Sequence, residues 1–249
     1  MFAPPFVAAG TADDALVQSG QALLSPDGTA EWLGQPLSEL LSLQPFWNDL
    51  LPDGYLKDGG RYRSRRHSCF VAVNNGVTQS TRRAHWQPLD YNALHGGIER
   101  WYEPVQAELA AHPAFQALLL RLARSASRLR GPQPWFIEAH PFRIDTEGGI
   151  GRPTPEGAHR DGVDLVAVLL MARVHIKGGE TRVFDAHGPQ GQRFTLTEPG
   201  SLLLLDDPRV IHEATPIQPE GAARGHRDTL VITLRAGGFQ GLDGVAAQV

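Results

Sequence analysis

The second half of the chain, from Pro134 onward, is a succession of short β-type segments separated by Gly, Pro and Asp turns. Strands that recur at intervals of about 8–12 residues with turn signals between them are typical of an all-β sandwich or barrel. We therefore predict a double-stranded β-helix, the jelly roll of cupin-like proteins, over residues 134–236. Its strands are predicted at 135–144, 163–171, 181–184, 193–196, 201–205, 210–217 and 229–234.

The first half has a different pattern. Apolar residues at helical spacing follow Leu37, and residues 98–129 predict two helices, the second beginning near Pro113. Residues 66–73 predict a strand that ends at the turn Asn74-Asn75-Gly76. We expect an α+β fold with one domain over 1–249, in which a mainly helical part (1–133) packs on one sheet of the β core and a tail follows at 237–249. The inward helix face is predicted to be Phe115, Leu118, Leu119 and Leu122.

Composition excludes several classes of protein. A net charge of −4 over 249 residues provides no basic surface for nucleic acid. The longest apolar runs are far shorter than the roughly 20 residues of a membrane helix. The first residues lack the basic start of a signal peptide, and the single cysteine, Cys69, fits a reducing compartment. We expect a cytoplasmic protein without nucleic-acid or membrane partners; its oligomeric state is left open, with a homodimer among the options.

His159, Asp161 and the distant His212 are the strongest candidates for chemistry. Residues two apart on a strand point to the same face, so we expect His159 and Asp161 to converge. A jelly roll places distant strands side by side, and His212 follows a turn, a buried strand and a second turn. An isolated His-x-Asp also arises by chance. Two imidazoles and one carboxylate nevertheless form the ligand set that holds non-haem Fe(II) and leaves coordination positions open.

Four stretches, in this order, carry a family resemblance: 155–162, 177–185, 199–217 and 227–234. Through them the sequence resembles the Fe(II)/2-oxoglutarate-dependent dioxygenases over about residues 134–236. Within that superfamily it is similar to a bacterial group of amino-acid hydroxylases that includes free L-isoleucine 4-hydroxylase and a protein named for biofilm, stress and motility.

The resemblance implies roles by position. His159, Asp161 and His212 would bind the iron, and Arg227 would pair with the C5 carboxylate of 2-oxoglutarate. Thr229 lies two residues further on, where many relatives have serine, and its hydroxyl would face the same carboxylate. Arg143, on the strand predicted at 135–144, is a further candidate for an anionic group of either substrate; the alternative is a surface arginine.

The activity implied is hydroxylation of a small molecule, a free L-amino acid, with consumption of O₂ and release of succinate and CO₂. Three alternatives remain. The first is a cupin-type metal enzyme that does not use 2-oxoglutarate. The second is a non-catalytic sensor, linked to stress or biofilm, that binds iron and 2-oxoglutarate. The third is an enzyme that oxidises a side chain of a protein or nucleic acid.

Two further polar features have a structural and a functional interpretation. For His140, on a strand beside the predicted pocket, we favour a hydrogen-bonded role without contact to substrate. We interpret the basic run 61–67 as a solvated strand edge or loop; the alternative is that one of its arginines reaches the pocket and holds a substrate carboxylate. Substrate specificity is expected to lie in residues 60–100, as loops carry such functions on a rigid scaffold.

Overall fold

The computed structural model describes residues 2–92, 94 and 96–241. A large antiparallel sheet forms its centre, with the strand order β1-β11-β7-β14-β6-β3-β2, and β4 pairs with both β6 and β5. The strands of this sheet are β1 (Gln21–Leu24), β2 (Leu51–Pro52), β3 (Arg63–Arg65), β4 (Ser68–Val73), β5 (Gly76–Gln79), β6 (Trp135–Asp145), β7 (Leu165–Val174), β11 (Leu202–Asp206) and β14 (His226–Ala236).

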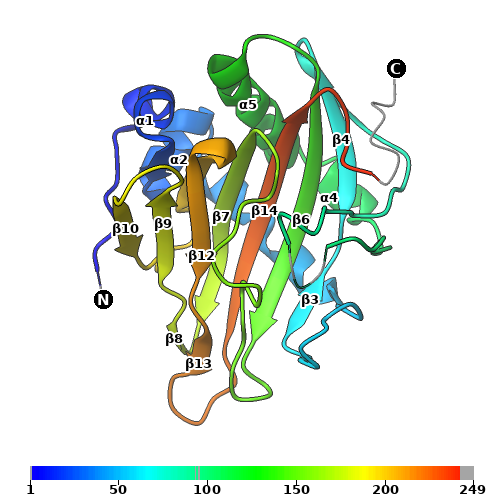
Figure 1. The fold of residues 1–249 in the computed structure, drawn as a ribbon, viewed down its shortest axis with the longest axis vertical. Coiled ribbons are helices and arrows are strands. Elements are labelled where there is room, and N and C mark those ends of the chain that lie inside the picture. Colours follow the sequence, from blue (N-terminus) through cyan, green and yellow to red (C-terminus); the bar gives the residue numbers. More distant parts are fainter. Residues whose placement is uncertain (1, 93, 95, 242–249) are drawn as a thin grey trace.

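A smaller sheet lies in front of the large one (Figure 1), and the two together form the jelly-roll-like core. Its strand order is β10-β9-β12, with a short β8–β13 pair beyond it. The space between the sheets contains an apolar cluster that includes Leu203 and Leu205 of β11 and Val183 of β9. The added strands are β8 (Ile176–Gly178), β9 (Thr181–Asp185), β10 (Gly191–Phe194), β12 (Val210–Ala214) and β13 (Ile217–Pro219).

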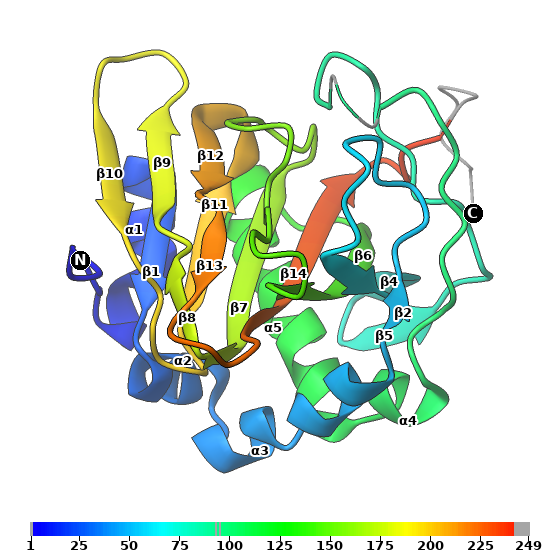
Figure 2. The ribbon, with the colours of Figure 1, turned by 90° about the horizontal axis from the view of Figure 1, so that it is seen from below.

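Helices cover the other face of the large sheet (Figure 2). Leu202 and Leu204 of β11 alternate with the residues that face the small sheet and pack in this helical layer. The α-helices are α1 (Ala12–Ser19), α2 (Pro26–Leu33), α3 (Leu37–Leu41), α4 (Ala107–Ala110) and α5 (Pro113–Arg130), and the 3-10 helices are η1 (Ala9–Thr11), η2 (Gln44–Asp49) and η3 (Asp207–Arg209). Pro113 begins α5 as predicted, and the predicted inward face of that helix is fully buried.

The N-terminal part is less helical than predicted. Its strand β1 extends the large sheet by pairing with β11, and β2 to β5 extend the opposite end. The predicted strand and turn near residue 70 are confirmed as the β4–β5 hairpin, in which Asn74 has a φ of 55°. Of the predicted tail, residues 242–249 lie outside the described part of the chain. Among the helices that the structure describes, none has the length and apolarity needed to cross a membrane.

Candidate metal centre and adjoining cavity

A loop between β6 and β7 brings the first two metal-ligand candidates to the third. His159 forms a single antiparallel bridge with His212 of β12, and the backbone N–H of each donates to the carbonyl of the other at 3.0 and 2.9 Å. The predicted strand at His159 and Asp161 is therefore wrong: apart from this bridge the segment is irregular. The bridge still brings the three side chains together, which is what the strand was expected to do.

The three side chains converge on one point. His212 Nε2 lies 3.6 Å from one carboxylate oxygen of Asp161, and His159 Nε2 lies 3.9 Å from the other. One ligand atom from each residue falls within 4.8 Å of those of the other two. His159 Nδ1 donates to the carbonyl of Gly157 at 2.9 Å, because a carbonyl can only accept. In the neutral ring, Nε2 then presents a lone pair, as a ligand to a divalent metal must.

Asp161 and its loop are held by residues that sequence reasoning missed. The side-chain amide of Gln87 donates to Asp161 Oδ1 at 3.1 Å. The carboxylate of Asp207 accepts the backbone N–H groups of Asp161, Gly162 and Val163 at 2.8–3.1 Å. Burial and the nearby charge of Asp161 raise the pKa of Asp207 to about 7. No pattern in the sequence announces Gln87, because its contact depends on how a long loop packs.

A cavity of about 140 Å³ adjoins the three candidate ligands. Alternate residues of two central strands line it: Glu138, His140, Phe142 and Ile144 of β6, and Arg227, Thr229, Val231 and Thr233 of β14. The intervening residues of the same strands, among them Ile137 and Ile232, pack into the helical layer. A cavity of this size accommodates a small organic molecule, since one of about 150 Å³ holds benzene.

Arg227 provides a buried cation in this cavity. It is 5% exposed, and its Nε has no hydrogen-bond partner among the described residues. Burial, together with the neighbouring Arg173, lowers the pKa of Arg227 to about 10, so it remains charged at neutral pH. The carboxylate that acts on Arg227 electrostatically, Asp228, is already bound by Arg143, and a buried cation without an ion-pair partner of its own is costly. Arg227 and Thr229 therefore fit an anionic cosubstrate whose carboxylate would pair with the arginine.

Arg143 is placed elsewhere and requires a correction. It lies between Phe142 and Ile144 on β6, so its side chain leaves the opposite face of the strand. There its guanidinium binds both carboxylate oxygens of Asp228, at 2.8 and 2.7 Å. Asp228 is its cross-strand partner. With its charge already paired and its side chain outside the cavity, Arg143 does not fit the expected role in binding an anionic substrate group.

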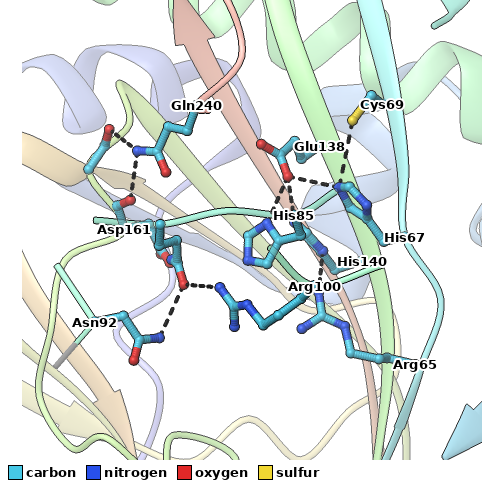
Figure 3. A network of polar contacts seen from close by, with 12 residues as sticks. Arg65, His67, Cys69, His85, Asn92, Arg100, Glu138, His140, Asp161 and Gln240 are labelled. Carbon is cyan, nitrogen blue, oxygen red and sulfur yellow. Dashed lines mark hydrogen bonds and ion pairs between the residues drawn. The ribbon is translucent and has the colours of Figure 1, made fainter. Parts of the chain in front are cut away.

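Three imidazoles surround the carboxylate of Glu138 on the cavity wall (Figure 3). His67 Nε2 and His85 Nδ1 both donate to Glu138 Oε2 at 2.8 Å, and His140 Nε2 lies 3.9 Å from the same oxygen. Burial acts to raise the pKa of Glu138, but His85 and His67 outweigh it and lower that pKa. Burial lowers the pKa of His85 to about 3, which leaves it neutral. His140 lines the cavity, and its Nδ1 is hydrogen-bonded to Arg65 at 2.6 Å, which agrees with the hydrogen-bonded role that we favoured.

The basic run 61–67 is also only partly solvated. Arg61 is exposed, but Arg63 and Arg65 are buried and line the cavity, so the interpretation as a solvated edge is wrong for these two. The strand β3 pairs with β6 and thereby aims alternate side chains inward. The expected specificity segment 60–100 supplies much of the cavity wall through Arg63, Arg65, His85, Gln87, Asn92 and Arg100.

Comparison with known proteins agrees with this geometry. Residues 44–233, most of the chain, match the family described as 2OG-Fe dioxygenase, so the chain belongs to that family. The protein is an oxygenase whose cofactors are Fe(II) and 2-oxoglutarate, and it contains the ligand set that such an iron requires. No protein of curated function matches the chain.

Solved structures show the same fold. A bsmA homolog from Methylobium petroleophilum PM1 is 52% identical, with a TM-score of 0.90 over 96% of this chain and 97% of that one. The IDO from Bacillus thuringiensis is 18% identical (TM-score 0.74; 94% and 98% covered), and the Fe(II)/(alpha)ketoglutarate-dependent dioxygenase TqaL is 20% identical (0.72; 94% and 88%). At these identities the last two show the fold alone.

Proposed function

We propose that the protein hydroxylates a free L-amino acid in a reaction that converts 2-oxoglutarate and O₂ into succinate and CO₂. The observation that carries this proposal is the convergence of His159, Asp161 and His212 beside a cavity that also contains the buried Arg227. The cavity is lined by buried side chains, among them Arg65, Arg100 and Arg227, and an enclosed site favours a small molecule over a side chain presented by a protein or nucleic acid.

Each residue has a distinct role in this proposal. His159, Asp161 and His212 hold the Fe(II), which with 2-oxoglutarate and O₂ supplies the oxidising chemistry when bound. Arg227 binds the C5 carboxylate of 2-oxoglutarate, where its planar guanidinium can engage two oxygens, and the Thr229 hydroxyl faces the same group. Apolar side chains such as Phe142, Val168 and Val231 exclude water from the space beside the iron.

Arg227 is the feature that disfavours a cupin-type enzyme without 2-oxoglutarate. Such an enzyme has no use for a buried guanidinium without a counter-ion beside its metal. We expect Arg227→Met to lose affinity for 2-oxoglutarate while it retains the iron. Unchanged affinity for 2-oxoglutarate in that variant, measured by isothermal titration calorimetry, would contradict the assigned role.

The test of the proposed function is succinate production by Fe(II)-loaded protein with 2-oxoglutarate, ascorbate and each proteinogenic amino acid in turn. We expect one or more amino acids to stimulate succinate formation and to yield a product about 16 mass units heavier, as one inserted oxygen atom requires. Succinate formation that no amino acid stimulates would contradict the substrate class. Binding of iron and 2-oxoglutarate without any turnover would instead indicate the sensor.

A further inference from the structure

A second group of cations lines the cavity, separate from Arg227. Arg65 and Arg100 are 3% and 2% exposed, and their charges repel each other. Arg227, in contrast, interacts with Arg173 and Asp228. Figure 3 shows both members of the second group beside His85 and His140. The cavity therefore has two cationic regions, of which 2-oxoglutarate would occupy only the one at Arg227.

Arg65 is held rigidly but not neutralised. Its guanidinium carbon lies 4.0 Å from the ring centre of Tyr102 and 4.2 Å from that of Phe142. One terminal nitrogen donates to His140 Nδ1 at 2.6 Å, and Nε has no partner among the described residues. Burial lowers the pKa of Arg65 to about 10, which still leaves a full positive charge at neutral pH.

Arg100 is likewise buried and has a donor without a partner among the residues that the structure describes. One of its terminal nitrogens donates to the side-chain oxygen of Gln87 at 2.9 Å, while its Nε is buried without a partner in the described part of the chain. Burial lowers the pKa of Arg100 as well. Both arginines thus keep a buried donor that a bound molecule can satisfy.

Asp53 and Glu156 act electrostatically on these arginines, but neither forms an ion pair with them. Glu156, which also lines the cavity, lies 3.6 Å from His159 Nε2 and keeps a buried Oε2 without a partner in the described part of the chain. Asp53 forms its ion pair with Arg63 at 2.7 Å, and Glu138 accepts from His67 and His85. Among the described residues, none places a carboxylate within ion-pair distance of Arg65 or Arg100. Two buried guanidinium groups without an anion are costly, and enclosing an anion between them removes that cost.

We propose that Arg65 and Arg100 bind a carboxylate of the primary substrate and so direct the rest of that molecule toward the iron ligands. The substrate class is then a carboxylic acid, and the inference rests on the proposed function. His85 adds a complementary group: its Nδ1–H donates to Glu138, so the Nε2 of this neutral ring is an acceptor on the cavity wall. A carboxylate beside an ammonium group, as in a free amino acid, matches both features.

A second metal ion at His67, His85, Glu138 and His140 is the competing interpretation of this wall. A guanidinium can only donate, so His140 Nδ1 must accept from Arg65, and its proton must reside on Nε2. A neutral His140 cannot then offer Nε2 to a metal. The two imidazole donors also already bind Glu138 Oε2, the carboxylate oxygen that faces the three histidines. The contacts therefore favour recognition of an anion.

The test measures binding to protein loaded with Fe(II) and 2-oxoglutarate under nitrogen. Each proteinogenic L-amino acid and its carboxamide are titrated by calorimetry. We expect at least one acid to bind, with its carboxamide weaker by roughly 30-fold or more, because a buried charge loses its partner.

Arg65→Met and Arg100→Met should weaken binding of the acid by a similar factor. Arg61→Met, which removes an exposed arginine of the same run, is the matched control and should change nothing. Thermal unfolding verifies that each variant is folded.

Equal affinity for acids and carboxamides would overturn the inference, as would unchanged affinity in both cavity variants. Failure of every acid to bind the loaded protein would also overturn it. The outcomes separate the two proposals. An acid that binds through the arginines but does not stimulate succinate formation contradicts only the proposed function. Turnover stimulated by a molecule that lacks a carboxylate contradicts the anion site while it preserves the oxygenase.

Discussion

Gln87 links the metal centre to the cavity wall through a single side-chain amide. Its nitrogen donates to the carboxylate of Asp161, and its oxygen accepts from Arg100 and from Asn92 at 2.9 and 3.1 Å. An amide suits this position because it donates on one side and accepts on the other. Gln87 therefore orients one proposed iron ligand and the guanidinium that we assign to substrate.

Substitution of Gln87 is expected to weaken the metal site. Groups that hydrogen-bond to metal ligands typically contribute about 10–100-fold to metal affinity. Gln87→Leu should therefore bind Co(II), used as a spectroscopic substitute for Fe(II), about 10–100-fold more weakly in a titration followed by visible absorption. Gln79→Leu, at an exposed glutamine that bonds Ser68, is the control. Equal Co(II) affinity in the two variants would contradict a contribution of Gln87 to metal binding.

His85 should make folding sensitive to acid. Its pKa is about 3 in the folded protein and near 6.5 when unfolded, so below pH 6.5 only the unfolded chain takes up this proton. Stability is therefore lost as pH falls from about 6.5 toward 3, by up to ~1.4 kcal/mol per pH unit. His85→Asn should show a shallower decline in the free energy of unfolding between pH 7 and 5 in urea titrations. Parallel pH profiles for variant and wild type would contradict the buried neutral imidazole.

At the scale of elements, the alternation of side chains along β6 and β14 separates the residues of the site from those that pack against the helices. One face of β6 and β14 lines the cavity, and the other packs against α5 and its neighbours. Leu119 of α5 is fully buried in this layer. Leu119→Ala should cost about 2–5 kcal/mol of stability, measured in urea, and leave the metal affinity of the folded protein unchanged. Arg124→Ala, on the exposed side of the helix, should stay within about 0.5 kcal/mol. A loss of metal affinity in the leucine variant would show that the two faces are coupled.

The elements that sequence predicts well are those with a long alternating pattern. Strands β6, β7 and β14 and helix α5 have enough residues for periodicity to show, and all were predicted. Strands β1 and β2, of four and two residues, were missed, and β3, of three residues, lay in a run that we interpreted as a strand edge or loop. Their existence depends on the partners β11 and β6, which lie far away in the sequence.

The residues of the site also fall into those that the sequence predicts and those that it does not. His159, Asp161, His212 and Arg227 were predicted because residue type and order carry the information, and the structure brings all four to one cavity. Arg63 and Arg65 looked like solvated charges because composition says nothing of the pairing that turns β3 inward. Arg143 shows the reverse error: strand parity alone places it outside, since its neighbours Phe142 and Ile144 line the cavity.

At the scale of the whole molecule, the proposed metal centre joins segments that are distant in the chain. His159 and Asp161 come from the loop after β6, His212 belongs to the small sheet, and Arg227 belongs to the large one. Ligands that bind only the folded state stabilise it, by about 2.7 kcal/mol at a concentration 100 times their Kd. Fe(II) with 2-oxoglutarate should therefore raise the thermal midpoint under nitrogen, and a chelator should reverse the rise. A thermal midpoint that changes neither with Fe(II) and 2-oxoglutarate nor with the chelator would contradict a binding site formed by these distant segments.

The most direct test of the central claim is iron-dependent conversion of 2-oxoglutarate to succinate in the wild type, Asp161→Ala and Asp185→Ala. Asp185 is an exposed aspartate on β9 and serves as the control. Because Asp161 supplies the only carboxylate of the described triad, its loss should abolish iron retention and succinate formation together. We expect the wild type and Asp185→Ala to bind an equivalent of iron and to produce succinate at the same rate. Succinate formation at the wild-type rate by Asp161→Ala would contradict the assignment of His159, Asp161 and His212 as the iron site.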